Sequence, residues 1–342
     1  MTISLVTGGS GFIGQHLVDQ LLAAGEQVRV LDIEPPWVRR VGVDYIEGSV
    51  TDPKAVREAM DGVHHLYHTA AIPHLWIPDP RMFEETNVVG TRIVFDEALN
   101  ADVGRVVHTS SATVLIDGVV GSQPTTRDES HKTTECGLIG HYARSKWRAE
   151  MVAQRYARKL PVVIVLPTLP FGPGDRHLTP PSRMLLDFVT GKNRAYADCI
   201  LNILDVRDVA AGHRLACTHG RSGQRYLLNS HSLPLNAFLE CLETLTGRPM
   251  PKWRIPGAAA LTFSAGFELW SNLVSGRAPI APLSGTRMAL HPVIFDGSLA
   301  EAELGLPATP LVRILSDAVA WLASEGHLVA ESGNATLVLD DR

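Results

Sequence analysis

A glycine-rich stretch, TGGSGFIG, occupies residues 7–14 of this chain. It directly follows the apolar run ISLVT and directly precedes FIGQHLVDQLLAAG, whose apolar residues recur with the spacing of a helix. In such a strand–turn–helix unit, Gly8 allows a sharp turn, Gly11 lets backbone N–H groups approach a diphosphate, and Gly14 lets the helix pack closely on the strand. Because the N-terminus of a helix favours anions, the stretch predicts a dinucleotide site.

An acidic residue supports this prediction and indicates which dinucleotide binds. Asp32 closes the second expected strand, QVRVLD, about 20 residues after the glycine loop begins. A carboxylate there accepts hydrogen bonds from the adenosine ribose hydroxyls and repels a 2′-phosphate, so NAD is favoured over NADP. Arg39 and Arg40 lie close enough in the sequence to keep the NADP alternative open.

Strands and helices alternate through the first half of the chain. The runs HHLYHTA, RVVHTSS and PVVIVLP are typical of buried strands, and helical patterns separate them. This alternation predicts an α/β fold, a Rossmann-type doubly wound parallel sheet with a smaller, mostly helical C-terminal substrate lobe. The expected NAD-binding domain comprises 1–170 and 200–229, the substrate lobe 171–199 and 230–328, and a C-terminal tail 329–342.

The lobe contains one strongly apolar helical pattern, IPGAAALTFSAGFELW at 255–270. It is too short to span a bilayer, and Glu268 interrupts it, so we expect a buried helix of the lobe rather than a membrane anchor. Peripheral contact with a membrane stays open.

Tyr142 and Lys146 stand four residues apart in GHYARSKWRAE, and on a helix they share one face. A surface helix with chance spacing is one interpretation. The other is a proton-transfer pair, because hydride transfer to or from a carbinol carbon requires a proton to move on its oxygen. A neighbouring ammonium group is expected to lower the pKa of a phenol towards the working range. HTSSATV, at the end of the fifth strand, supplies hydroxyl groups that can hold the substrate oxygen.

An ordered series of motifs now resembles a known family. TGGSGFIG, HTAA, TNVVGT, TSSATV, YARSK, FGPGD and ILDVRDVA occur in the order found in the extended short-chain dehydrogenases/reductases, the NAD-dependent epimerase/dehydratase family, and cover roughly 1–325. The second half is most similar to the dihydroflavonol-reductase-like, 3β-hydroxysteroid-dehydrogenase-like and hopanoid-associated members. The resemblance implies a cytoplasmic, NAD-dependent enzyme that acts on a small-molecule substrate as a homodimer.

The resemblance also assigns roles to single residues. It implies Ser111 as the catalytic serine, Tyr142 as the general acid/base and Lys146 as its electrostatic partner. The residues implied to bind the cofactor are Gly8, Gly11, Phe12, Ile13, Gly14, Asp32, Ser49, Val50, Thr69, Ala70, Ala71, Thr86, Asn87, Thr109, Tyr142, Lys146 and Pro167. One departure is Ser49, a neutral residue where the family usually has an aspartate beside the adenine.

Three reactions share this catalytic trio. Dehydration is disfavoured because Ala112 and Thr113 occupy the positions where dehydratases carry an acid and a base. A nucleotide-sugar epimerase needs a diphosphate anchor, and Arg183, Arg254 and Arg287 lack a spacing that marks one. We therefore expect hydride transfer between the nicotinamide and a secondary alcohol or ketone of a bulky, mainly apolar substrate (terpenoid, steroid-like or polyphenolic). The epimerase is the alternative, and a non-catalytic NAD-binding sensor or scaffold is a remote one.

Composition excludes several other classes of function. The 342 residues are 45% hydrophobic and carry a net charge of −5, so no basic surface for nucleic acid is expected. The four cysteines show no ligand-like spacing, which indicates reduced thiols in the cytoplasm. The histidines of VHHLYHTAAIPH have no carboxylate or cysteine at a suitable spacing, and no metal site is expected.

Overall fold

The computed structural model describes residues 2–118 and 123–328 and is built on a seven-stranded sheet. All neighbouring strands of this sheet are parallel, in the order β11-β7-β5-β4-β1-β2-β3. The direction of winding reverses between β1 and β4, as in doubly wound nucleotide-binding folds, and confirms the predicted fold class. The strands are β1 (Ile3–Thr7), β2 (Gln27–Asp32), β3 (Val43–Glu47), β4 (His65–His68), β5 (Arg105–Thr109), β7 (Val162–Pro167) and β11 (Arg225–Leu228).

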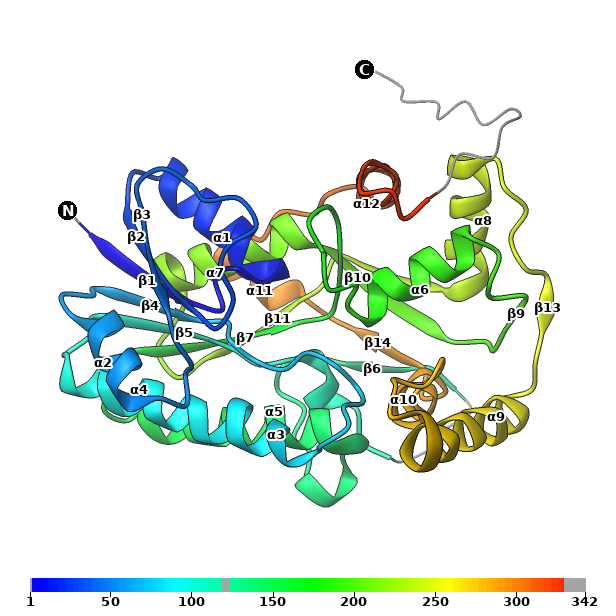
Figure 1. The fold of residues 1–342 in the computed structure, drawn as a ribbon, viewed down its shortest axis with the longest axis horizontal. Helices are drawn as coiled ribbons and strands as arrows, with labels where there is room; N and C mark the ends of the chain where they lie inside the picture. The colour runs from blue at the N-terminus through cyan, green and yellow to red at the C-terminus, as the bar shows by residue number, and fades with distance from the viewer. Residues whose placement is uncertain (1, 119–122, 329–342) are drawn as a thin grey trace.

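Helices cover both faces of the sheet (Figure 1). Alternate residues of each strand point to opposite faces, so that Leu5 and Leu66 enter one apolar core while Val6 and Tyr67 enter the other. The first core is closed by α2 (Pro53–Met60), α4 (Gly90–Asn100) and α5 (Gly140–Tyr156). The second is closed by α1 (Phe12–Ala23), α7 (Val206–His219) and α11 (Ser298–Leu304). Because each strand has an apolar core on both of its faces, its sequence is almost continuously apolar.

Two short helical segments precede α4 and continue into it without a break. This helical path begins with α3 (Arg81–Phe83), continues as the π-helical segment η1 (Glu84–Val89) and then enters α4. Within η1, Asn87 is almost fully buried. Single-turn π segments are rare and are frequent at functional sites, and this one borders the site described below.

The lobe has its own small sheet and core. A three-stranded sheet of β8 (Leu169–Phe171), β10 (Ile200–Asp205) and β12 (His231–Pro234) packs with α6 (Pro180–Val189), α8 (Leu235–Thr246) and α12 (Leu311–Ser324) around Phe171 and Phe238. β10 thus pairs with lobe strands, although it lies within the range 200–229 that the sequence pattern assigns to the NAD-binding domain. Two short ladders complete the chain: β6 (Thr125–Arg127) with β14 (Val293–Phe295), and β9 (Ala195–Tyr196) with β13 (Trp253–Arg254).

The expectation of a buried apolar helix in the lobe is wrong. α9 (Gly257–Trp270) continues as the π-helical segment η4 (Ser271–Ser275). Within α9, which the structure describes throughout, only Ala260 and Ser264 are buried, because α10 (Leu283–Ala289) covers just one side of the helix. None of the helices in the described residues is long and apolar enough to cross a membrane. The expected tail 329–342 lies outside the described residues.

Candidate active site

The glycine loop joins β1 to α1 in a space that only glycine fits. Gly8 has a φ of +73°, and a Cβ atom there would lie 2.7 Å from the Cα of Ala70. A Cβ atom on Gly14 would lie 2.1 Å from the carbonyl oxygen of Gly8. Gly11 precedes α1, and no side chain within 2–118 and 123–328 caps this N-terminus. The first-turn N–H groups beside Phe12 therefore remain available to an anion, and the loop fits the diphosphate of NAD.

Asp32 ends β2 beside this loop. Its carboxylate accepts hydrogen bonds from the backbone N–H groups of Ser10, at 2.9 Å, and Glu34, at 3.1 Å. Burial raises the pKa of Asp32, while these N–H groups lower it. Arg40 forms an ion pair with Asp19 at 2.6 Å, so its charge is already compensated. The arrangement fits a ribose diol next to Asp32.

Other residues predicted to bind the cofactor lie at the same carboxyl edge of the sheet. Thr69 follows β4, and its hydroxyl donates to the carbonyl of Thr7 at 2.7 Å; Ala70 and Ala71 come next in the chain. Pro167 ends β7 and is buried. Since the carboxyl ends of parallel strands meet at one edge, these positions can all border one extended ligand.

Ser49 and Val50, predicted to lie at the adenine, contact other parts of the protein. The Ser49 hydroxyl lies 2.7 Å from that of Thr51 and also accepts a hydrogen bond from the Thr51 N–H. Val50 is buried in the core between the sheet and α2, α4 and α5. Both residues therefore shape the turn after β3, and an adenine contact by Ser49 would compete with Thr51.

Asn87 connects the loop after β4 with α5. Its side-chain oxygen accepts from the N–H of Ile72 at 2.8 Å, and its side-chain nitrogen donates to the hydroxyl of Ser145 at 2.9 Å. Ser145 in turn donates to the carbonyl of Tyr142 at 2.8 Å. Asn87 is thus committed to positioning the helix that carries Tyr142, whereas the neighbouring Thr86 is partly exposed. Ser145 was not identified from the sequence, although it lies inside YARSK.

The predicted catalytic hydroxyls meet at the carboxyl end of β5. Ser111 caps the short 3₁₀ helix η2 (Ala112–Leu115). Its hydroxyl accepts hydrogen bonds from the Thr113 N–H, at 3.2 Å, and from the Thr113 hydroxyl, at 2.9 Å. Tyr142, from the first turn of α5, lies close enough to Ser111 for the serine side chain to lower the pKa of its phenol. The serine and the phenol, 31 positions apart in the chain, therefore face the same point.

Lys146 lies one helical turn beyond Tyr142 and is almost fully buried. Its ammonium group donates to the carbonyl of Thr109 at 2.5 Å. Burial lowers the pKa of Lys146 to about 8, and the carboxylate of Glu150 acts in the opposite direction. Glu150 is itself buried, accepts a hydrogen bond from Ser110 at 2.6 Å and pairs with Arg225 at 2.8 Å. Its spacing from Lys146, four residues on a helix, could have identified it from the sequence.

The pKa of Tyr142 differs from the sequence-based expectation. Burial raises the pKa of Tyr142, and the neighbouring Ser111 side chain lowers it. Lys146, whose ammonium group donates to the carbonyl of Thr109, does not contribute the expected lowering. A phenol with a raised pKa keeps its proton at neutral pH. Such a group can donate a proton to a developing alkoxide.

An apolar cluster lies next to Tyr142 in the chain. The chain neighbours of this tyrosine pack against α10 in a small cluster of Leu138, Ile139, Ala143 and Met288, bordered by Leu75. The three arginines considered as a diphosphate anchor, Arg183, Arg254 and Arg287, are exposed on three different elements, and one of them pairs with Asp198 at 3.7 Å. Ala112 and Thr113, in the dehydratase positions, supply neither an acid nor a base.

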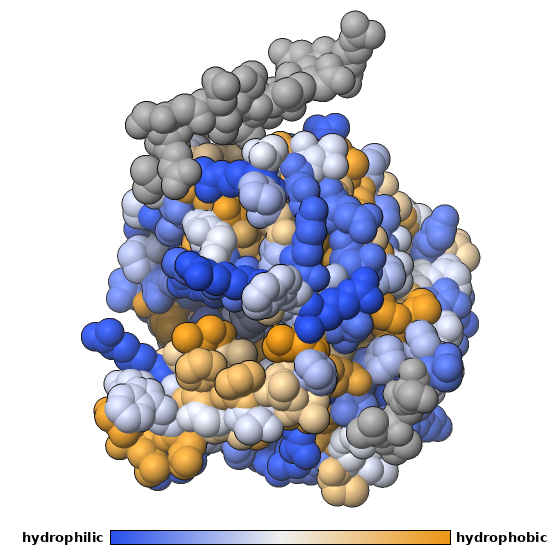
Figure 2. All heavy atoms as spheres, turned by 90° about the vertical axis from the view of Figure 1, so that its right-hand side faces the viewer, coloured by the Kyte–Doolittle hydropathy of each residue, from blue (hydrophilic) through white to orange (hydrophobic). Residues whose placement is uncertain are grey.

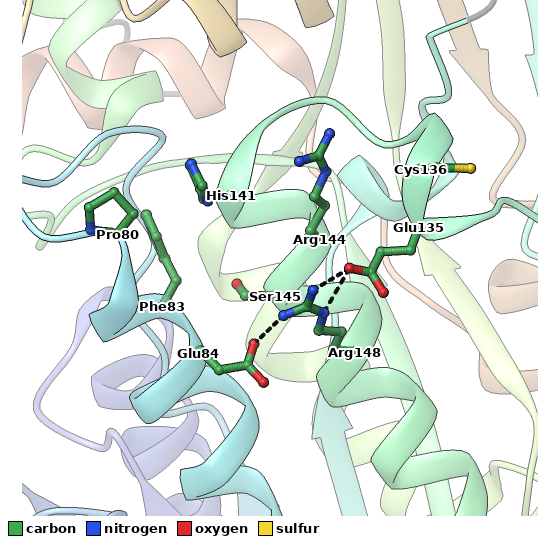
Figure 3. A pocket seen from close by; sticks show the side chains of 9 residues that line it. All are labelled: Pro80, Phe83, Glu84, Glu135, Cys136, His141, Arg144, Ser145 and Arg148. Atoms are coloured by element: carbon green, nitrogen blue, oxygen red, sulfur yellow. Dashed lines mark hydrogen bonds and ion pairs between the residues drawn. The ribbon is translucent and has the colours of Figure 1, made fainter.

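A cavity of about 680 Å³ lies on a different face of α5 (Figure 3). Its walls hold Arg148, which bridges Glu84 at 2.7 Å and Glu135. Tyr142 and Lys146 do not line it. The remaining lining residues are Pro80, Phe83, Cys136, His141, Arg144 and Ser145. This cavity is therefore distinct from the candidate catalytic centre.

Comparisons with known proteins agree with the geometry. The chain matches the model of the NAD dependent epimerase/dehydratase family over residues 4–228. It is 38% identical to a "Putative dihydroflavonol 4-reductase" of Synechocystis, covering 94% of this chain and 95% of that protein, and 34% identical to sterol demethylase protein B of Methylococcus capsulatus, covering 95% and 99%.

A solved structure, the crystal structure of gox2253, superimposes with a TM-score of 0.83 at 31% identity, covering 96% of this chain and 100% of that one. The match therefore includes the lobe as well as the sheet. The chain belongs to the NAD-dependent epimerase/dehydratase family of extended short-chain dehydrogenases/reductases, and it is an NAD-dependent enzyme.

Proposed function

We propose that this enzyme transfers hydride between the nicotinamide and a secondary alcohol or ketone of a bulky, mainly apolar substrate, such as a terpenoid, steroid-like or polyphenolic compound. The observation that carries the proposal is the apolar cluster that flanks Tyr142 and includes Met288 of the lobe. A nucleotide sugar would require cations at this position. The names of the two relatives, "Putative dihydroflavonol 4-reductase" and "Sterol demethylase protein B", support the same substrate class.

In the proposed reaction, NADH supplies a hydride or NAD accepts one. The glycine loop and Asp32 would hold the cofactor at the carboxyl edge of the sheet. Ser111 would donate a hydrogen bond to the substrate oxygen, and Tyr142 would give that oxygen its proton during reduction and remove it during oxidation. Because burial raises the pKa of Tyr142, the phenol is protonated at neutral pH and has the proton that reduction of a ketone requires.

The experiment that tests this proposal is an NADH absorbance assay with a panel of ketones. The panel contains steroid-like, terpenoid and polyphenolic ketones together with UDP- and dTDP-sugars. We expect stoichiometric NADH consumption with members of the apolar group only. Interconversion of a nucleotide sugar without net change in NADH would replace this proposal with the epimerase, and cofactor binding without turnover of any compound would favour a sensor.

We also infer that the enzyme acts in the cytoplasm as a homodimer. All four cysteines lie within the described residues and are free, which suits a reducing compartment. Two apolar side chains, Met82 and Val89, are exposed on the helical path beside α5 and offer a surface for a second copy. Sedimentation velocity tests the dimer: a concentration-independent monomer would contradict it.

A further inference from the structure

One side of α9 and η4 presents large apolar side chains to solvent. Phe263, Phe267, Trp270 and Val274 are 62%, 41%, 60% and 62% exposed, respectively. Their spacing of four, three and four residues places them on one side of the helical path. Leu273, 74% exposed, lies next to them. We call these five residues the α9 face.

Isolated exposed apolar residues are normal on proteins, but contiguous groups of this size mark interaction sites. Figure 2 views the molecule from the right-hand side of Figure 1 and shows hydrophobic side chains gathered in its lower part, where α9 and α10 lie, below a largely hydrophilic surface. The α9 face is part of a convex helical surface, which fits a flat, deformable partner better than a protein that would need a groove.

The segment of the chain that contains the α9 face carries mainly positive charges. Between residues 251 and 295 the chain carries Lys252, Arg254, Arg277 and Arg287 but a single acid, Glu268, although the whole protein has a net charge of −5. The Glu268 carboxylate accepts a hydrogen bond from the N–H of Leu283 at 2.7 Å, which directs it to the start of α10. Arg254 pairs with Asp198; the other three cations are exposed. This local charge is complementary to an anionic surface.

The α9 face is also connected to the catalytic region. Asn272, in η4, accepts a hydrogen bond from the indole N–H of Trp76 at 3.0 Å, in the loop after β4. Ser284, in the neighbouring α10, donates to the carbonyl of Leu75 at 3.2 Å. Met288 of α10 then packs in the cluster that flanks Tyr142. A partner held by the α9 face would therefore lie beside the wall of the catalytic centre.

We propose that the α9 face docks onto an anionic lipid bilayer. The aromatic and aliphatic side chains enter the boundary between headgroups and acyl chains, and the surrounding cations contact the anionic headgroups, as in helices that lie in the plane of a membrane surface. Docking places the lobe beside a phase in which apolar molecules are concentrated. The proposal concerns binding alone and does not depend on which substrate is reduced.

Vesicle flotation with the full chain tests this proposal, without cofactor or substrate. Phosphatidylcholine vesicles with and without phosphatidylglycerol are the probes. We expect the protein to float with the anionic vesicles, less with the neutral ones, and less again at high salt. The double variant Phe263→Ser/Leu273→Ser and the variant Arg277→Glu are each expected to bind anionic vesicles about tenfold more weakly.

The matched control is Val41→Ser, at a residue that is 98% exposed just before β3, a strand at the opposite end of the molecule from α9 (Figure 1). It should bind vesicles as the wild type does, and circular dichroism and NADH affinity should be unchanged in all variants. Failure of the wild type to bind anionic vesicles would overturn the proposal, as would equal binding by the double variant. A dimer in sedimentation velocity that the double variant abolishes, without vesicle binding, would assign the α9 face to a second copy instead.

Discussion

Two features shift the pKa of Lys146 in opposite directions. They are its burial and the carboxylate of Glu150, one helical turn further along α5. Burial lowers the pKa of Lys146 to about 8, and Glu150 raises it. The nearby histidines His68 and His213 are neutral at neutral pH, because burial lowers their pKa values to about 3 and about 4. Glu150 therefore opposes the effect of burial and favours the protonated form of Lys146.

Replacing this carboxylate should change the pH dependence of the reaction. In Glu150→Gln the pKa of Lys146 is expected to fall below about 8, so the alkaline limb of the kcat/KM profile moves to lower pH while activity below the limb is retained. The pH profile of wild type and variant measures the shift. An alkaline limb that stays in place would show that Glu150 acts only through packing.

Asp32 should determine the choice of cofactor. Asp32→Ala removes the charge that repels a 2′-phosphate and the acceptor for the ribose hydroxyls, so the preference for NADH over NADPH is expected to narrow by about tenfold or more. Fluorescence titration with both cofactors provides the two dissociation constants. Tighter binding of NADPH than NADH by the wild type would refute this role of Asp32.

At the scale of elements, a short segment of the lobe reaches across to the dinucleotide loop. The carbonyl of Gly174 accepts a hydrogen bond from Gln15 at 2.7 Å, and that of Pro173 lies 2.8 Å from the ring of His16. His177 lies 3.1 Å from the carboxylate of Glu34, just after β2. Residues 173–177, which we call the strap, thus connect the lobe to α1 and to the segment after β2.

The strap should contribute to cofactor affinity. Gly174 has a φ of +94°, and a Cβ atom there would lie 2.7 Å from the Gln15 side-chain nitrogen. Gly174→Ala is therefore expected to push the Gln15 side chain away, remove its hydrogen bond to the strap and weaken NADH binding by about tenfold. Gly191→Ala is the matched control, because Gly191 has a φ of +69° and nothing within 4 Å of its added Cβ atom. Equal affinities of the two variants for NADH would exclude a role for the strap.

At the scale of the whole molecule, stability should depend on buried neutral histidines. His68 and His213 are hydrogen-bonded to threonines of β1, α4 and β5, and burial holds their pKa values far below 6.5. The unfolded chain binds protons at these residues below pH 6.5, whereas the folded chain does not. The free energy of unfolding should therefore fall as the pH falls from 7 to 5, by about 2 kcal/mol for each histidine.

Urea unfolding at pH 7 and pH 5 measures this loss. His213→Asn should be less stable at pH 7, since it loses the contact with Thr109, but its stability should depend less on pH because one titrating group is gone. A variant with the same pH dependence as the wild type would rule out His213 as a source of the effect.

The sequence predicts those features that local patterns determine. The glycine loop, Asp32 and the alternation of strands and helices are visible in short windows, and the structure has them where expected. Glu150, the strap and the exposed α9 face depend instead on which elements pack together. The residue pattern of an apolar helix is the same whether or not another element packs against it. The exposure of Phe263 and Trp270 is therefore visible only in the structure.

In the proposed reaction, Tyr142 moves the proton that accompanies hydride transfer to an apolar ketone. A single turnover with NADH deuterated at the transferred position, followed by mass spectrometry of the alcohol, measures whether this transfer needs the phenol. The wild type should place one deuterium on the carbinol carbon, and Tyr142→Phe should give almost no product while its NADH affinity stays close to that of the wild type, because only the phenol oxygen is lost. Deuterated product formed by Tyr142→Phe at the wild-type rate would contradict this role of Tyr142.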